Sequence, residues 1–140
     1  MRHFILSLSL LASLSAISYG EIAVIVNPDN PISKLSKKDI QRLFLGRLQR
    51  FPDSDLKVES IDNDEGSQLY QSFYKQVINM SASKLKRYRA YYLFSGKGKL
   101  PEPLANSSRV ISHVASSKNA IGYVNSSDVN KDVKVVYISQ

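Results

Sequence analysis

The amino-acid sequence predicts an α/β fold in which helices flank a mostly parallel sheet. Short apolar runs typical of buried strands alternate along the chain with longer segments whose apolar residues recur at helical spacing. No internal repeat, low-complexity tract or linker interrupts residues 21–140. We therefore expect one domain there, large enough for a modest hydrophobic core.

Residues 1–20 have the composition of a secretory signal peptide. Arg2 precedes an apolar run over residues 4–17, and a small residue, Gly20, closes the segment. The apolar run is too short and too rich in serine for a membrane span. Cleavage after Gly20 and export to the periplasm are therefore expected, which would leave no integral membrane segment. The alternative, an uncleaved anchor, lacks the cationic flank that would hold it in the membrane.

The composition of the chain favours anionic partners. Lys and Arg together number 19 against 12 Asp and Glu, which gives a formal net charge of +7 at pH 7. Phosphate-like ligands, anionic membrane surfaces and acidic proteins are the classes that such a balance attracts. The chain has no cysteine, so a disulfide, a cysteine nucleophile and a cysteine zinc ligand are all excluded.

The first two elements follow from clear local signals. Residues 22–26 (IAVIV) form a continuous apolar run, typical of a strand that is covered on both faces. The segment LSKKDIQRLFLG predicts a short helix, with Ser36 at the N-cap and Asp39 three residues later as an aspartate version of the capping box. Gly46 is placed to end this helix. Its expected buried face and hydrophobic staple are Leu35, Ile40, Leu43 and Phe44.

The remaining elements are predicted from the alternating pattern of strands and the helical spacing of apolar residues. Residues 56–61 (LKVESI) alternate as a strand does, and residues 120–124 (AIGYV) and 133–138 (VKVVYI) predict two late strands. Helices are expected at residues 67–79 and at about 83–94, and a loop at SGKGK, residues 95–99. The second of these helices should turn Leu85, Tyr88, Tyr92 and Leu93 inward. A further helix is expected around Val110, Ile111, Val114 and Ala115, capped by Ser107 or Ser108.

The turn DNDEGS, residues 62–67, is the first candidate site. The free N–H groups in the first turn of a helix can bind an anion, and Gly66 would let a ligand approach the backbone. The Ser67 hydroxyl could either cap the helix or hydrogen-bond an oxyanion. Three carboxylates in the same turn would repel an anion, yet they also suit the positive end of a helix. An EF-hand calcium loop is excluded because glycine stands at the fifth position and Phe73 at the twelfth.

Two other segments carry positive charge. SGKGK offers backbone N–H groups and the Lys97 ammonium, or only a helix-ending glycine with solvated lysines, and it lacks the spacing of a Walker loop. KLKRYRAYY, residues 84–92, is basic and aromatic, but its tyrosines fall at core spacing and an exported chain would not meet nucleic acid. It is expected to be a solvated basic face, or else a docking surface for an acidic envelope partner or anionic lipid through Lys84, Lys86 and Arg87.

No combination of residues predicts an enzyme, a metal site or a cofactor. His113 is the only histidine after residue 20, and it lies within an apolar helical pattern typical of a core edge. Neither a GxSxG elbow nor an HExxH motif occurs. We therefore expect a binding or interaction protein.

Four stretches, in this order, resemble the type II periplasmic phosphate-binding proteins, the substrate-binding subunits of phosphate ABC importers. LSKKDIQRLFLGRLQRF is similar to a helix that ends in FLGK…W, and VESIDNDEGSQLYQSFYKQV to the family's phosphate loop. FSGKGK and NAIGYV are similar to its later glycine-lysine loop and its GAIGYV strand. The resemblance covers residues 21 to about 129 and implies a single lobe of a type II periplasmic binding protein. It also implies a phosphate-like anion held by Gly66 and Ser67, with positive charge from Lys97 or Arg47.

Two departures from the family are expected to weaken binding. The family's first lobe has no counterpart, so water would compete for the ligand's hydrogen bonds on one side. The arginine of the phosphate loop is also missing, because Asp62 and Asn63 occupy that region, and only Gly66 and Ser67 of the loop carry over. The resemblance thus implies weak or partner-assisted binding of phosphate or a similar anion. The alternative is an envelope adaptor that keeps the fold and binds no ligand.

Overall fold

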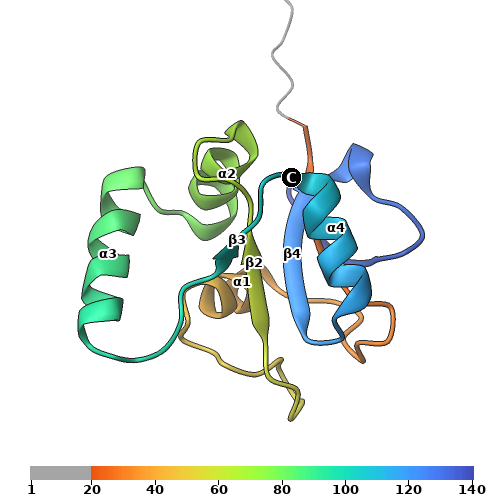
Figure 1. Cartoon of the computed structure of the whole chain (residues 1–140), viewed down its shortest axis with the longest axis horizontal. Coiled ribbons are helices and arrows are strands. Elements are labelled where there is room, and N and C mark those ends of the chain that lie inside the picture. The colour runs from red at the N-terminus through yellow and green to blue at the C-terminus, as the bar shows by residue number, and fades with distance from the viewer. Residues whose placement is uncertain (1–19) are drawn as a thin grey trace, which may run out of the picture.

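A five-stranded sheet lies at the centre of the molecule, with helices on both faces. The computed structural model describes residues 20–140, so the expected signal peptide lies outside the described residues except for Gly20. The elements in chain order are β1 (Ile22–Val26), α1 (Lys37–Phe44), β2 (Glu59–Asp62), α2 (Gln68–Phe73), the π-helical turn η1 (Tyr74–Ile78), α3 (Ala82–Phe94), β3 (Glu102–Pro103), α4 (Ser107–Ser116), β4 (Ala120–Asn125), the 3-10 turn η2 (Ser126–Asp128) and β5 (Lys134–Ile138). Figure 1 shows α4 in front of β4 and α3 at the edge of the molecule. None of the helices in this part of the chain is long and apolar enough to cross a membrane.

The strand order is β3-β2-β4-β1-β5. β2 pairs in parallel with β3 and β4, whereas β1 is antiparallel to both of its neighbours, β4 and β5. Because β1 opposes both neighbours, β2, β3, β4 and β5 all point the same way. The predicted α/β fold with a mostly parallel sheet is therefore confirmed, with β1 as the opposing strand.

The continuous apolar run of β1 is explained by two separate clusters of core side chains. Ile22, Val24 and Val26 join the cluster beneath α1, α2 and η1. Ala23 and Ile25 point to the other face, into the cluster that α4 covers. Every residue of β1 is buried, so the expectation that this strand is covered on both faces is confirmed.

The predicted first helix is confirmed at both ends. The Ser36 hydroxyl accepts a hydrogen bond from the backbone N–H of Asp39 at 3.1 Å, as an N-cap should. Beyond Phe44 the chain turns through Gly46, whose φ of +72° favours glycine. A Cβ at Gly46 would also lie 2.4 Å from the Tyr92 hydroxyl oxygen, so glycine is required there by packing as well.

Three expectations about the elements are corrected by the structure. The second strand covers Glu59–Asp62 rather than 56–61, because residues before it pair back with the preceding loop, as the Arg50–Lys57 bridge shows. The cap of α4 is the Asn106 side chain, which accepts from the Arg109 N–H at 3.0 Å, and not Ser107 or Ser108. Leu93, expected to face inward, is 55% exposed.

Candidate functional site

The turn between β2 and α2 is the candidate site that the sequence singles out. Ser67 is the N-cap of α2: its hydroxyl oxygen accepts from the Tyr70 N–H at 3.1 Å and donates to the Asp64 carbonyl at 2.6 Å. Both hydrogen-bonding roles of this hydroxyl are therefore used within the turn. The first-turn N–H groups of Gln68 and Leu69 have no acceptor within the helix, which leaves them available to a ligand. Gly66 is exposed beside them.

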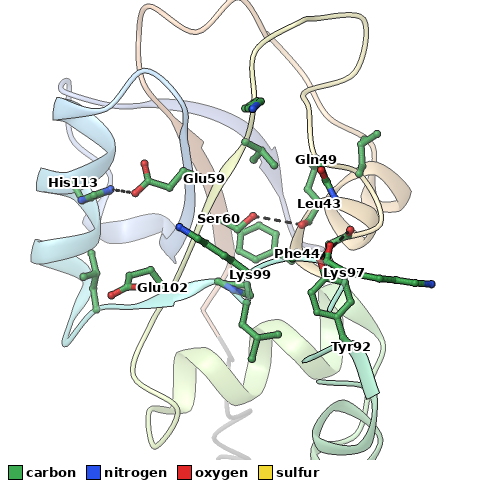
Figure 2. A pocket seen from close by; sticks show the side chains of 18 of the residues that line it. Leu43, Phe44, Gln49, Glu59, Ser60, Tyr92, Lys97, Lys99, Glu102 and His113 are labelled. Atoms are coloured by element: carbon green, nitrogen blue, oxygen red, sulfur yellow. Dashed lines mark hydrogen bonds and ion pairs between the residues drawn. The ribbon is translucent and has the colours of Figure 1, made fainter. Parts of the chain in front are cut away.

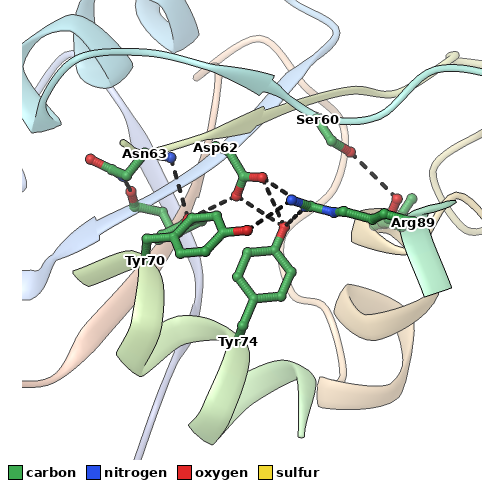
Figure 3. Close-up of polar contacts among 8 residues, drawn as sticks. Ser60, Asp62, Asn63, Tyr70, Tyr74 and Arg89 are labelled. Atoms are coloured by element: carbon green, nitrogen blue, oxygen red, sulfur yellow. Dashed lines mark hydrogen bonds and ion pairs between the residues drawn. The ribbon is translucent and has the colours of Figure 1, made fainter. Parts of the chain in front are cut away.

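Asp62 does not belong to the exposed acids of this turn. It ends β2, is 2% exposed, and points into the protein. Its Oδ1 accepts from the Tyr123 hydroxyl at 2.8 Å, and both of its oxygens accept from the Tyr74 hydroxyl, at 3.0 and 2.9 Å. The Arg89 guanidinium from α3 donates to Oδ2 at 2.9 Å. Figure 3 shows Tyr70 of α2, Tyr74 of η1 and Arg89 of α3 gathered around Asp62.

Arg89 links Asp62 to Tyr70 of α2 and Tyr74 of η1. Its Nη1 donates to the Tyr70 hydroxyl at 2.8 Å and its Nη2 to the Tyr74 hydroxyl at 2.6 Å. The guanidinium carbon also lies 4.9 Å from the centre of the Tyr74 ring, within the range of a cation–π contact. We call Asp62, Tyr70, Tyr74, Arg89 and Tyr123 the Asp62 cluster.

Burial sets the protonation states within the Asp62 cluster. It raises the pKa of the Asp62 carboxyl, and the Arg89 charge and the tyrosine hydroxyls oppose that rise without cancelling it. Burial also raises the pKa of Tyr74 and of Tyr123 well above the ordinary value, so both hydroxyls stay protonated and act as donors. The cluster thus surrounds the Asp62 carboxyl with hydrogen-bond donors.

Asn63 anchors the next position of the chain to β4. Its backbone N–H donates to the Tyr123 hydroxyl oxygen at 3.3 Å and its side-chain amide to the Tyr123 carbonyl at 2.8 Å. The Tyr123 ring stacks on Phe73 of α2, with ring centres 3.7 Å apart. The β2–α2 turn is therefore fixed by hydrogen bonds at its strand end and by aromatic packing at its helix.

These contacts change the charge that the turn presents to solvent. The sequence places three carboxylates in it, but Asp62 is buried and paired with Arg89. Only Asp64 and Glu65 are exposed there. The repulsion of an incoming anion is therefore smaller than the sequence implies.

Arg89 is the residue that sequence reasoning missed. It was grouped with the basic face of residues 84–92, yet its side chain is only 20% exposed. Its position gave a signal: Arg89 follows Leu85 by four residues and precedes Tyr92 by three, so it shares their inward side of the helix. The docking residues predicted on this helix, Lys84, Lys86 and Arg87, are all exposed.

The other two predicted ligand residues lie away from the turn. Lys97 borders a groove of about 830 Å³ beside the start of β2, whereas Gly66 and Ser67 follow the end of that strand. The Tyr92 hydroxyl donates to the carbonyls of Lys97, at 3.3 Å, and Gly46, at 3.5 Å. The next residue, Arg47, lies over the Tyr88 ring at 5.3 Å. The structure thus brings Arg47 and Lys97 to one end of α3 and separates them from Gly66 and Ser67.

The groove also contains the expected core-edge histidine. His113 Nε2 and Glu59 Oε1 lie 2.5 Å apart, and Ser117 donates to the other Glu59 oxygen at 3.2 Å. In Figure 2 the side chain of Lys99 extends toward this pair, while that of Lys97 extends away from it. Within residues 20–140 no three His, Cys, Asp or Glu side chains are grouped so that they could hold a metal ion.

The fold is similar to solved phosphate-binding proteins. One is a phosphate ABC transporter substrate-binding protein from Clostridium perfringens with bound phosphate, at a TM-score of 0.68 and 21% identity over 84% of this chain and 45% of that one. Others are an ABC-type phosphate transport receptor from Vibrio cholerae (TM-score 0.67, 16% identity, 84% and 46%) and PstS from Borrelia burgdorferi (TM-score 0.61, 15% identity, 84% and 47%). No protein-family model matches the sequence, and no curated protein matches it significantly.

These likenesses concern the fold. This chain spans less than half the length of each solved structure, and its fold matches a single lobe of a periplasmic binding protein of this type. The Clostridium protein is a transporter substrate-binding protein and the Vibrio protein a transport receptor.

Proposed function

We propose that this protein is an exported, periplasmic module that binds phosphate or a similar anion, weakly or with a partner that supplies a second wall. The observation that carries the proposal is the β2–α2 turn of a phosphate-receptor-like fold, with Gly66 exposed and first-turn N–H groups that have no acceptor within the helix. The ligand would contact the backbone at Gly66 and Ser67 and the N–H groups that follow. Lys97 or Arg47 is predicted to add positive charge to this ligand, but because both lie apart from the turn the proposal rests on Gly66 and Ser67.

Two features of the turn support weak rather than tight binding. No arginine side chain is free to hold phosphate in the turn itself, because Arg89 is engaged by Asp62 and two tyrosines. Exposed donors also compete with water for the ligand, which lowers the net gain from each hydrogen bond.

Calorimetric titration with phosphate at low salt, repeated with sulfate, tests the proposal. We expect saturable binding that is weakened about fivefold in Ser67→Ala, because loss of the N-cap hydrogen bond, worth about 1 kcal/mol, would loosen the first-turn N–H groups that contact the ligand. Ser81→Ala is the matched control, because Ser81 caps α3 with the same geometry, accepting from the Lys84 N–H at 3.2 Å. If both variants lose affinity equally, general loss of stability rather than a ligand contact is responsible.

Gly66→Ala gives an independent test of backbone approach. A Cβ there would meet only Asp64 Oδ2, at 3.4 Å, so the fold tolerates it. It would, however, crowd a ligand lying against the backbone, and phosphate affinity should fall while stability stays unchanged. Absence of saturable heat from wild type, alone and with envelope extract, would overturn the proposal.

An adaptor that keeps the fold without a ligand is the second candidate. It is favoured by one observation: the Ser67 hydroxyl is already fully engaged in capping α2. Capture of an envelope protein that is lost in Lys86→Glu/Arg87→Glu and unchanged in Ser67→Ala would support this function instead.

A further inference from the structure

The C-terminal end of α3 exposes a group of large apolar side chains. Phe94 is 94% exposed, Tyr91 66% and Leu93 55%. They face away from Tyr92, which is buried, and so cover the outer side of the last turn of the helix. We call Tyr91, Leu93 and Phe94 the apolar tip. An exposed apolar cluster on a small protein indicates an interaction surface, because its exposure to water is unfavourable.

Exposed cations flank the apolar tip on both sides. Lys86 and Arg87 precede it on the outer face of α3, and Lys97 and Lys99 follow it in the loop. No Asp or Glu occurs anywhere between Glu65 and Glu102. Since Arg89 is paired internally, the flanking charge is carried mainly by lysines, of which Lys97 extends away from the His113–Glu59 pair and Lys99 toward it (Figure 2).

We propose that the apolar tip and its flanking cations form a docking surface for an anionic lipid bilayer. Aromatic and apolar side chains beside Lys and Arg can enter the interfacial layer, with rings among the acyl chains and cations at the headgroups. In α3 only the last turn, and not a whole helix face, has this composition. Lysine is a compact, strongly hydrated charge suited to a diffuse anionic field, whereas protein interfaces favour Arg and deplete Lys. This charge complementarity favours a membrane surface over an acidic protein. The inference does not depend on anion binding at the β2–α2 turn.

The backbone presents the tip as a protrusion rather than a groove. Gly96, with a φ of +68°, turns the chain directly after the helix, and no atom lies within 4 Å of where its Cβ would be. Figure 1 shows this end of α3 at the periphery, away from the sheet. Phe94 and Leu93 could therefore enter a bilayer without any rearrangement of the core.

Co-sedimentation with lipid vesicles tests the docking surface. The full chain and residues 20–140, which contain every element of the described fold, are each mixed with vesicles of phosphatidylcholine alone or with phosphatidylglycerol added. Comparing the full chain with residues 20–140 separates binding by the apolar tip from binding by the apolar residues 4–17. We expect both forms to bind the anionic vesicles, and high salt to weaken binding of residues 20–140.

Matched variants assign the binding to the tip. Leu93→Ser/Phe94→Ser should lower partitioning at least about a hundredfold, since each substitution removes most of the transfer free energy of an apolar side chain. Ile138→Ser, at another exposed apolar residue, should not lower it. Lys97→Glu/Lys99→Glu should also lower it at least tenfold. Lys118→Glu/Lys131→Glu makes the same change in net charge at exposed residues elsewhere and should have a smaller effect.

A fluorescent probe checks insertion directly. The chain contains no tryptophan, so Phe94→Trp introduces a single one. Its emission should shift to the blue with anionic vesicles, whereas that of Ile138→Trp should not. No binding by residues 20–140, equal binding to neutral vesicles, or binding unchanged by the tip variants would overturn the proposal. So would self-association lost in Leu93→Ser/Phe94→Ser without vesicle binding, which would make the tip a protein interface.

Discussion

At the scale of single residues, the Asp62–Arg89 pair is the interaction whose loss should matter most. Asp62 is buried at the end of β2 and Arg89 reaches it from α3, 27 residues along the chain. Removing one partner of a buried pair leaves an uncompensated charge, which costs more than the intact pair contributes. We therefore expect the main effect of Arg89 to be that it makes a buried Asp62 tolerable, rather than that the pair adds net stability.

Arg89→Met should lower the free energy of unfolding by about 3 kcal/mol. Arg87→Met is the matched control, because Arg87 is exposed on the same helix, and it should change stability by less than about 0.5 kcal/mol. Urea denaturation followed by circular dichroism measures both. Adding Asp62→Asn to Arg89→Met should recover part of the loss. Equal stability of Arg89→Met and wild type would show that Asp62 is not charged in the fold.

The raised pKa of Asp62 gives a dependence of stability on pH. Folded Asp62 keeps its carboxyl proton to a higher pH than unfolded Asp62 does, because aspartates in an unfolded chain titrate at about 4. As pH rises through this window, the unfolded state loses its proton first, so the free energy of unfolding falls. The free energy of unfolding of wild type minus that of Asp62→Asn should therefore decline with rising pH and then level off. A difference that grows with pH would mean that the pKa is lowered.

At the scale of elements, the close contact of α4 with β4 depends on one glycine. A Cβ at Gly122 would lie 2.7 Å from Val110 Cγ1 and 3.4 Å from Val114 Cγ2, two buried residues of α4. The strand is held by β1 and β2 on its two sides, so the helix would have to move outward. Gly122 is therefore a packing residue of the helix–sheet interface.

Gly122→Ala should destabilise the protein by about 2 kcal/mol, the typical effect of overpacking a core. Gly66→Ala should be nearly neutral, since its Cβ would meet a single flexible side-chain atom. Chemical denaturation of the two variants side by side makes the comparison. Similar losses in both would point to a backbone effect of alanine rather than to the helix contact.

At the scale of the whole molecule, the sheet joins two cores into one cooperative unit. The cluster beneath α1 and α2 and the cluster beneath α4 share β1, whose alternate side chains enter both. Neither cluster can lose β1 without exposing the other. Because the chain has no cysteine, this sharing rather than a disulfide connects the two faces.

Residues 20–140 should therefore unfold in one transition. Helical circular dichroism reports mainly on the helices, whereas tyrosine fluorescence reports on all tyrosine rings, of which Tyr74 and Tyr123 are buried. The two urea curves should coincide, as two-state behaviour requires. Separate midpoints would show that one helical layer unfolds independently of the sheet.

The sequence by itself determined the features that depend on near neighbours. The strand at 22–26 and the cap of α1 by Ser36 appear where the local pattern predicts them, because period and capping are set within a few residues. The sequence allows the Ser67 hydroxyl either to cap α2 or to bind an oxyanion, and in the structure it caps the helix. The candidate turn was also found this way, since a glycine-serine step before a helix is a local signal.

Only the tertiary structure decided which charges the site presents. Asp62 meets Tyr123 across 61 residues and Arg89 across 27, and no local periodicity specifies such a meeting. Burial changes the role of both residues. Asp62, expected to repel a ligand, accepts hydrogen bonds inside the protein, and Arg89, expected in solvent, is its partner. Leu93 shows the same limit, because helical spacing predicts a face for it but not whether another element covers that face. Long-range packing sets desolvation, and desolvation sets what each charged or apolar side chain can do.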